Sequence, residues 1–113
     1  MASSVFVIVT DCDREKALEV GLIYPLNCAK NKWLDEVKVI FFGPPSEKLA
    51  AFDMKVQEKI KEMKDYGVEM LACKWCSDGM SITTQLEAQG IKVAYVGPII
   101  SELIKNGWAQ LTF

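Results

Sequence analysis

Segments with the pattern of a buried strand alternate with helical segments along the whole of this sequence. The opening run, Val5–Thr10, is an unbroken series of β-branched and aromatic residues, typical of a strand that is buried on both faces. Similar runs follow at 37–42, 68–72, 91–96 and 108–113, joined by helical segments and short turns. Because neighbouring parallel strands are usually connected through a helix, this alternation predicts an α/β fold with a mostly parallel five-stranded sheet. A chain of 113 residues is the size of one domain, so we predict a single three-layer α/β/α domain over residues 1–113.

The helical segments carry recognisable start and stop signals. Asp11 and Asp13 are candidate N-caps for the first helix, and Pro25 predicts that this helix kinks or restarts. Apolar residues between 49 and 63 recur at steps of three and four, which predicts one long helix that begins at Ser46 and is ended by Gly67. Gly107 is placed to end the last helix, and the final strand is expected at an edge of the sheet.

The composition excludes several classes of function. With 13 basic and 15 acidic residues the net charge is −2, so no basic field is available to attract nucleic acid. The chain has no histidine, which excludes catalysis by Ser-His-Asp or Cys-His groups and all histidine-containing metal sites. Cys73 and Cys76 supply only half of a zinc site, and we expect neither a metal nor a cofactor. The chemistry that remains available is mainly that of sulfur.

The sequence predicts a cytoplasmic location. No positively charged segment precedes the run Val5–Val9, which is far too short for a signal sequence or a membrane span, so we expect no contact with a membrane. The four cysteines lack the dense spacing of a small secreted domain, and we interpret them as free thiols in a reducing compartment.

The candidate site lies where the predicted strands end. Ligands of open parallel sheets bind beyond the carboxyl ends of the strands. The predicted binding residues come directly after the predicted strands: Cys12, Gly43, Lys74, Ser77 and Gly97. Cys28 lies in the first helical region and is expected in the core.

Cys73 and Cys76 are the predicted catalytic residues. A strand-to-helix turn offers unpaired backbone N–H groups and a helix dipole, both of which favour a thiolate, and Lys74 adds a nearby cation. The second cysteine is placed to resolve a persulfide or disulfide formed at the first. The alternative is that both thiols are buried and pack as small hydrophobic groups.

Three related site types fit this sequence less well. A thioredoxin-type cysteine pair normally follows the first strand of its domain, whereas this pair follows the third. A Cys-x5-Arg phosphatase loop is excluded because the only arginine is Arg14. The stretch 76–81 is locally similar to the phosphocysteine loop of sugar-phosphotransferase IIB domains, but that loop also follows a first strand.

With strand order and cysteine position both considered, the whole chain resembles the DsrE/DsrF-like family of small sulfur-relay proteins. The resemblance is carried by the opening strand, by the strand ending in Phe-Phe-Gly at Gly43, by Ala72-Cys73 at the end of the third strand, and by the closing segments 90–97 and 99–107. It implies assembly into a homotrimer or hexamer and transport of sulfur as a cysteine persulfide. Cys73 matches the strand-end cysteine of the family, whereas the role of Cys76 as a resolving thiol is our own addition.

Two functions follow as hypotheses. The first is a sulfur carrier or sulfurtransferase in which Cys73 receives a sulfane sulfur and passes it to a partner protein. The expected partners are other copies of this chain and a protein that donates or accepts the sulfur. The alternative is a non-catalytic oligomeric binding or scaffold subunit with a small-ligand pocket at the strand edge. Its motivation is the number of large aromatic residues near loops and ends: Trp33, Trp75, Trp108 and Phe113.

Overall fold

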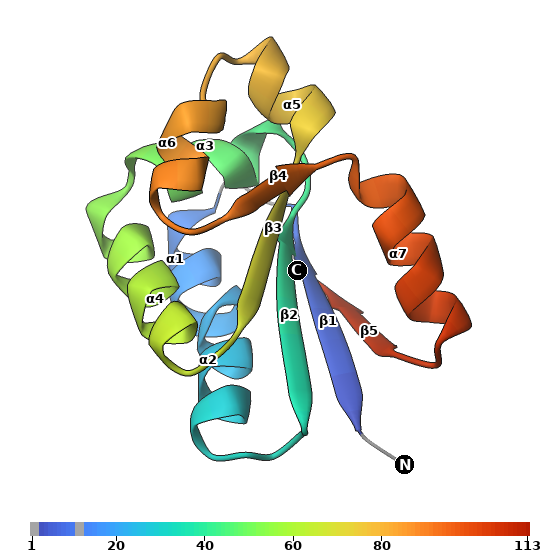
Figure 1. The fold of residues 1–113 in the computed structure, drawn as a ribbon. Helices are drawn as coiled ribbons and strands as arrows, with labels where there is room; N and C mark the ends of the chain where they lie inside the picture. The colour runs from blue at the N-terminus through green and yellow to red at the C-terminus, as the bar shows by residue number, and fades with distance from the viewer. Residues whose placement is uncertain (1–2, 11–12) are drawn as a thin grey trace.

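The computed structural model describes residues 3–10 and 13–113, so the predictions made for Asp11 and Cys12 lie outside the described residues. A five-stranded sheet lies between helices that cover its two faces (Figure 1). The α/β fold and the three-layer arrangement predicted from the sequence are thereby confirmed. The strands are β1 (Ser4–Val9), β2 (Glu36–Phe41), β3 (Glu69–Cys73), β4 (Lys92–Ala94) and β5 (Ala109–Thr112). The helices are α1 (Arg14–Lys16), a π-helical turn (Ala17–Gly21), α2 (Ile23–Lys30), α3 (Pro44–Phe52), α4 (Met54–Asp65), α5 (Lys74–Gly79), α6 (Thr83–Ala88) and α7 (Val96–Lys105).

Every pair of neighbouring strands is parallel, in the order β4-β3-β2-β1-β5. The register places Val7 of β1 beside Val39 of β2 on one side and beside Leu111 of β5 on the other. The expectation that the last strand lies at an edge is therefore correct. Because all strands run the same way, the ends of β1, β2, β3 and β4 meet at one edge of the sheet.

The two faces of the sheet belong to two separate apolar clusters. On one face, alternate residues of β1 such as Val5 and Val7 pack with the larger cluster formed by α2, α3, α4 and α6. On the other face, Phe6 and Ile40 pack with Val96 and Leu103 of α7. Figure 1 shows α7 standing alone on that side of the sheet. Cys73 belongs to the smaller cluster.

The prediction of one continuous helix between Ser46 and Gly67 is wrong, because the chain forms two helices that meet at Asp53. The backbone of Asp53 is extended, and its carboxylate accepts hydrogen bonds from the N–H groups of Lys55 (3.0 Å) and Val56 (3.1 Å). This N-cap starts α4 in a new direction and leaves Phe52, which the apolar periodicity had placed in the core, 60% exposed. Arg14 pairs with the same carboxylate.

The first helical region follows the prediction closely. Asp13 caps α1 by accepting a hydrogen bond from the N–H of Lys16, and the chain passes through the π-helical turn before α2 restarts at Ile23. Pro25 lies in the first turn of α2, where its missing N–H is tolerated. Cys28 is fully buried, as expected for a core residue. No described helix is long and apolar enough to cross a membrane.

Candidate functional site

The candidate site is the carboxyl edge of β2 and β3, where the structure places both predicted catalytic cysteines. Cys73 is the last residue of β3, and its extended backbone leads directly into α5. Cys76 lies in α5, whereas the sequence had predicted a loop between the strand and the next helix. Gly43 follows β2 at the same edge and starts α3.

The two thiols differ in their access to solvent. Cys73 is 7% exposed and packs with Leu71 and Val96 in the cluster beneath α7. Cys76 is half-buried and packs against the same cluster. Both are free thiols. The expectation of an accessible sulfur atom therefore fits Cys76 better than Cys73, which is buried.

The surroundings of Cys76 favour the neutral thiol. Burial, together with the neighbouring Cys73 thiol and Glu47 carboxyl, raises the pKa of Cys76 to about 12. The prediction of a thiolate stabilised at this turn is consequently wrong for Cys76 in the resting protein. The physical reason is that packing around the Cys76 thiol removes water and brings in an acidic group.

The acidic group is Glu47, a residue that sequence reasoning did not identify. It lies in α3, which packs against α5, and its side chain is fully buried. Neither carboxyl oxygen has a hydrogen-bond partner of normal geometry among the described residues. Burial raises the pKa of Glu47 to about 7, although interactions with the Cys76 thiol and the Gly43 backbone act in the opposite direction.

Nothing in the local sequence indicates that Glu47 is buried. An acidic residue in the first turn of a helix is usually solvent-exposed and stabilised by the helix dipole. Its burial results from the packing of α3 against α5 and α6, which are separated from it by more than a strand and a helix of sequence.

Lys74 and Ser77 form a hydrogen-bond network on α5. The Lys74 ammonium pairs with Asp78 at 2.8 Å, and this partner raises the pKa of Lys74 and lowers that of Asp78. Ser77 is fully buried; its hydroxyl donates to the Lys74 carbonyl (3.3 Å) and lies 2.9 Å from the Thr83 hydroxyl. Thr83 donates in turn to Asp78 (2.6 Å). These contacts tie α5 to α6 and hold the helix that carries Cys76.

The predicted glycines differ in their surroundings. Gly43 has a φ of +113°, a conformation that disfavours any side chain, and a Cβ there would lie 3.9 Å from the Thr10 carbonyl oxygen. Gly97 lies in α7, and no heavy atom stands within 4 Å of where its Cβ would be. Within residues 3–10 and 13–113, no group of three or more His, Cys, Asp or Glu side chains could hold a metal ion.

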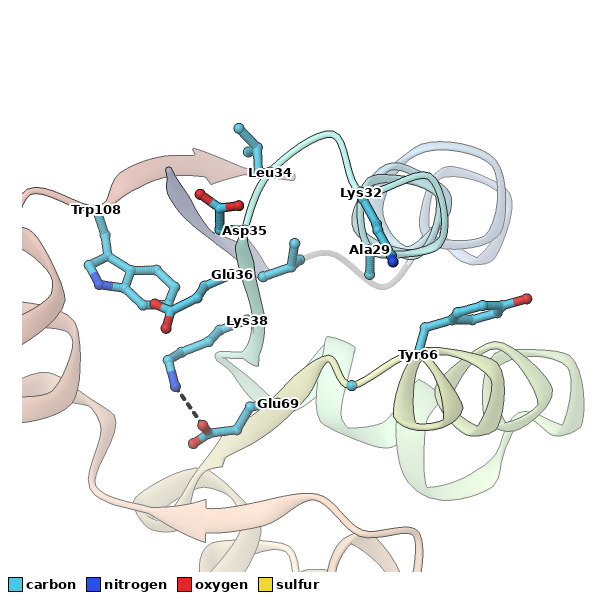
Figure 2. Close-up of a pocket in the computed structure, with 11 residues that line it drawn as sticks. Ala29, Lys32, Leu34, Asp35, Glu36, Lys38, Tyr66, Glu69 and Trp108 are labelled. Atoms are coloured by element: carbon cyan, nitrogen blue, oxygen red, sulfur yellow. Dashed lines mark hydrogen bonds and ion pairs between the residues drawn. The ribbon is translucent and has the colours of Figure 1, made fainter. Parts of the chain in front are cut away.

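A hollow of about 430 Å³ lies at the other end of the strands and does not include the cysteines (Figure 2). Glu36 and Lys38 at the start of β2 and Glu69 at the start of β3 contribute to its wall. The Lys38 ammonium pairs with Glu69 and lies 5.3 Å from the centre of the Trp108 ring. The hollow is thus separate from the Cys73–Cys76 pair, and its Lys38 ammonium already has an acidic and an aromatic partner.

Fold and site together define a small all-parallel α/β domain with a cysteine at a strand end. The chain belongs to the DsrE/DsrF-like family, whose model matches residues 4–113. This family is linked to sulfur relay. The resemblance stated from the sequence is therefore confirmed. No match was found among proteins with curated descriptions.

Solved structures that share the fold include the following three. A conserved protein of unknown function from Bacteroides thetaiotaomicron, BT1422, is 29% identical, with a TM-score of 0.87 over 97% of this chain and 95% of its own. The ychN protein from E. coli is 13% identical, with a TM-score of 0.77 over 98% and 99% of the two chains. MTH1491 from Methanobacterium thermoautotrophicum, also of unknown function, is 16% identical, with a TM-score of 0.72 over the same shares.

Proposed function

We propose that this protein is a sulfur carrier that holds a persulfide on Cys73 and passes it to a partner protein. The observation that supports this most directly is the position of Cys73 at the end of β3, beside a second thiol, in a member of a family linked to sulfur relay. The same comparisons do not favour the non-catalytic scaffold considered from the sequence.

The loading step exchanges one thiol for another. A donor persulfide R–S–SH meets the Cys73 thiol, the donor S–S bond breaks, and a new bond forms between the Cys73 sulfur and the terminal sulfur. The donor leaves as R–SH, and no net oxidation occurs because the sulfane sulfur keeps its oxidation state. Burial of Cys73 supports this role, since a persulfide held there is shielded from other thiols until a partner docks.

Mass spectrometry after incubation with a persulfide donor tests this proposal. We expect the wild-type protein to gain the mass of one sulfur atom and Cys73→Ser to gain none. Cys28→Ala is the matched control, because Cys28 is also buried but lies in α2, away from the site. A wild-type protein that stays unmodified under conditions that load a known carrier contradicts the proposal.

Location and assembly are part of the same proposal. Cys73 and Cys76 are free thiols, and loading with sulfur requires that they stay reduced. A cytoplasmic compartment would keep them reduced. A homotrimer or hexamer would cover apolar side chains that this chain leaves exposed, among them Ile104 of α7 (59%) and Leu111 of β5 (39%). Light scattering on the purified protein distinguishes these assemblies from a monomer, which would contradict this part of the proposal.

A further inference from the structure

We infer that Glu47 is the proton acceptor of the Cys73–Cys76 pair: it takes the proton of the Cys76 thiol when Cys76 attacks a sulfur-bearing Cys73. This inference rests on the proposed function for its natural substrate, but its chemistry can be measured without a persulfide donor. It adds a third member to the site and a second route for the bound sulfur besides transfer to a partner, in which the protein releases it as hydrosulfide.

The geometry supports this role for Glu47 in two ways. The carboxyl is fully buried and lacks a regular hydrogen-bond partner among the described residues, which is an unfavourable state that a purely structural residue would rarely adopt. The side chain that interacts with it is the Cys76 thiol, and that thiol in turn interacts with Cys73. The three groups therefore lie in the sequence carboxyl, thiol, thiol, from α3 through α5 to the end of β3.

The titration properties of the groups fit proton transfer. With a pKa of about 7, the Glu47 carboxyl is poised to take up and return a proton near neutral pH, whereas Cys76 does not ionise there unaided. Among the described residues, the Glu47 carboxyl and the Cys76 thiol act on each other. The one other titratable group that acts on them from a packed element is Cys73, at the end of β3. Lys74, two residues before Cys76, is paired with Asp78.

The release step balances as follows. As Cys76 attacks the Cys73 sulfur, its proton moves to the Glu47 carboxylate, and a Cys73–Cys76 disulfide forms. The bond between Cys73 and the sulfane sulfur breaks, and its electron pair leaves with that sulfur, which departs as hydrosulfide. Two cysteine thiols are oxidised and one sulfane sulfur is reduced to sulfide, so the two-electron exchange is complete within the protein.

The closing reaction is tested with an aromatic disulfide, dithiobis(nitrobenzoate), on a Cys28→Ala, Cys12→Ser background. The reagent first forms a mixed disulfide with the pair and releases one nitrothiolate. Peptide mapping of the trapped mixed disulfide identifies the fraction that carries the reagent on Cys73, because only this form closes through attack by Cys76. The remaining thiol then closes the disulfide and releases a second nitrothiolate, in a step whose rate does not depend on protein concentration. Because loss of a general base typically slows a reaction about 10²-fold or more, we expect Glu47→Gln to slow this second step by that factor at neutral pH.

The pH profile separates proton transfer from a structural effect. In the protein with Glu47 the closing rate should rise through a step near the carboxyl pKa, whereas in Glu47→Gln only the continuous rise from thiol ionisation should remain. Glu47→Asp should restore the step at a reduced rate. Glu58→Gln removes the same charge from the exposed face of α4 and should behave like the parent protein. Near-ultraviolet circular dichroism verifies that each variant is folded.

Equal closing rates and equal pH profiles for the parent and Glu47→Gln would overturn the inference. This result is independent of the proposed sulfur-carrier function, which is judged by the loading of Cys73. Where loading succeeds, the same variant should retain the added sulfur longer and release hydrosulfide more slowly than the parent.

Discussion

The buried carboxyl of Glu47 makes the stability of this protein depend on pH in a specific window. Its pKa is about 7 in the folded protein and 4.5 when solvated, so the folded state binds a proton more tightly than the unfolded state between those values. The free energy of unfolding therefore falls as the pH rises through this window, and the loss is complete above the folded pKa. At about 1.4 kcal/mol for each tenfold change in proton affinity, the cost approaches about 3 kcal/mol.

Replacing Glu47 by glutamine removes this dependence while keeping the shape of the side chain. The variant should gain stability relative to wild type by up to about 3 kcal/mol as the pH rises from about 4.5 to about 8. Urea unfolding under reducing conditions at a series of pH values measures this difference, with the three tryptophans as fluorescent probes. The exposed Glu58→Gln serves as the control and should show no such trend. A difference between Glu47→Gln and wild type that stays constant over the whole range would refute the reasoning.

Three further features of the fold are tested by urea unfolding of substituted proteins. Asp53→Ala removes the N-cap of α4 and the ion pair with Arg14, and it should lower the free energy of unfolding by about 1–2 kcal/mol. Asp53→Asn keeps the cap and should lower it less. Equal losses for the two variants would contradict the capping role. Gly43→Ala should lower the free energy of unfolding by about 1–3 kcal/mol, and Gly67→Ala should lower it less. The reason is that φ is +113° at Gly43 but +83° at Gly67, which is closer to the left-handed region that side chains tolerate. Trp75→Ala should change stability by no more than about 0.5 kcal/mol because this side chain is 79% exposed, and a larger loss would show that it packs against a second copy of the chain.

The sequence was sufficient to predict the elements whose pattern reflects their own surroundings. Val5–Val9 was predicted as a doubly buried strand because both of its faces are covered, and no other arrangement suits such a run. The break at Asp53 was missed because the apolar spacing continues across it, although Asp before a helical segment is itself a start signal. Glu47 could not be found in this way: its burial depends on which helices meet in three dimensions, and a single sequence does not contain that information.

The position of β5 next to β1 has a consequence for synthesis of the chain. Residues 109–112 flank β1 on one side. The backbone hydrogen bonds of β1 on that side can therefore form only after this distant segment has left the ribosome. Until then the apolar β1 is an open edge, to which the strand of another nascent chain can add. A chain stopped before Ala109 should accordingly be recovered in inclusion bodies rather than in the supernatant.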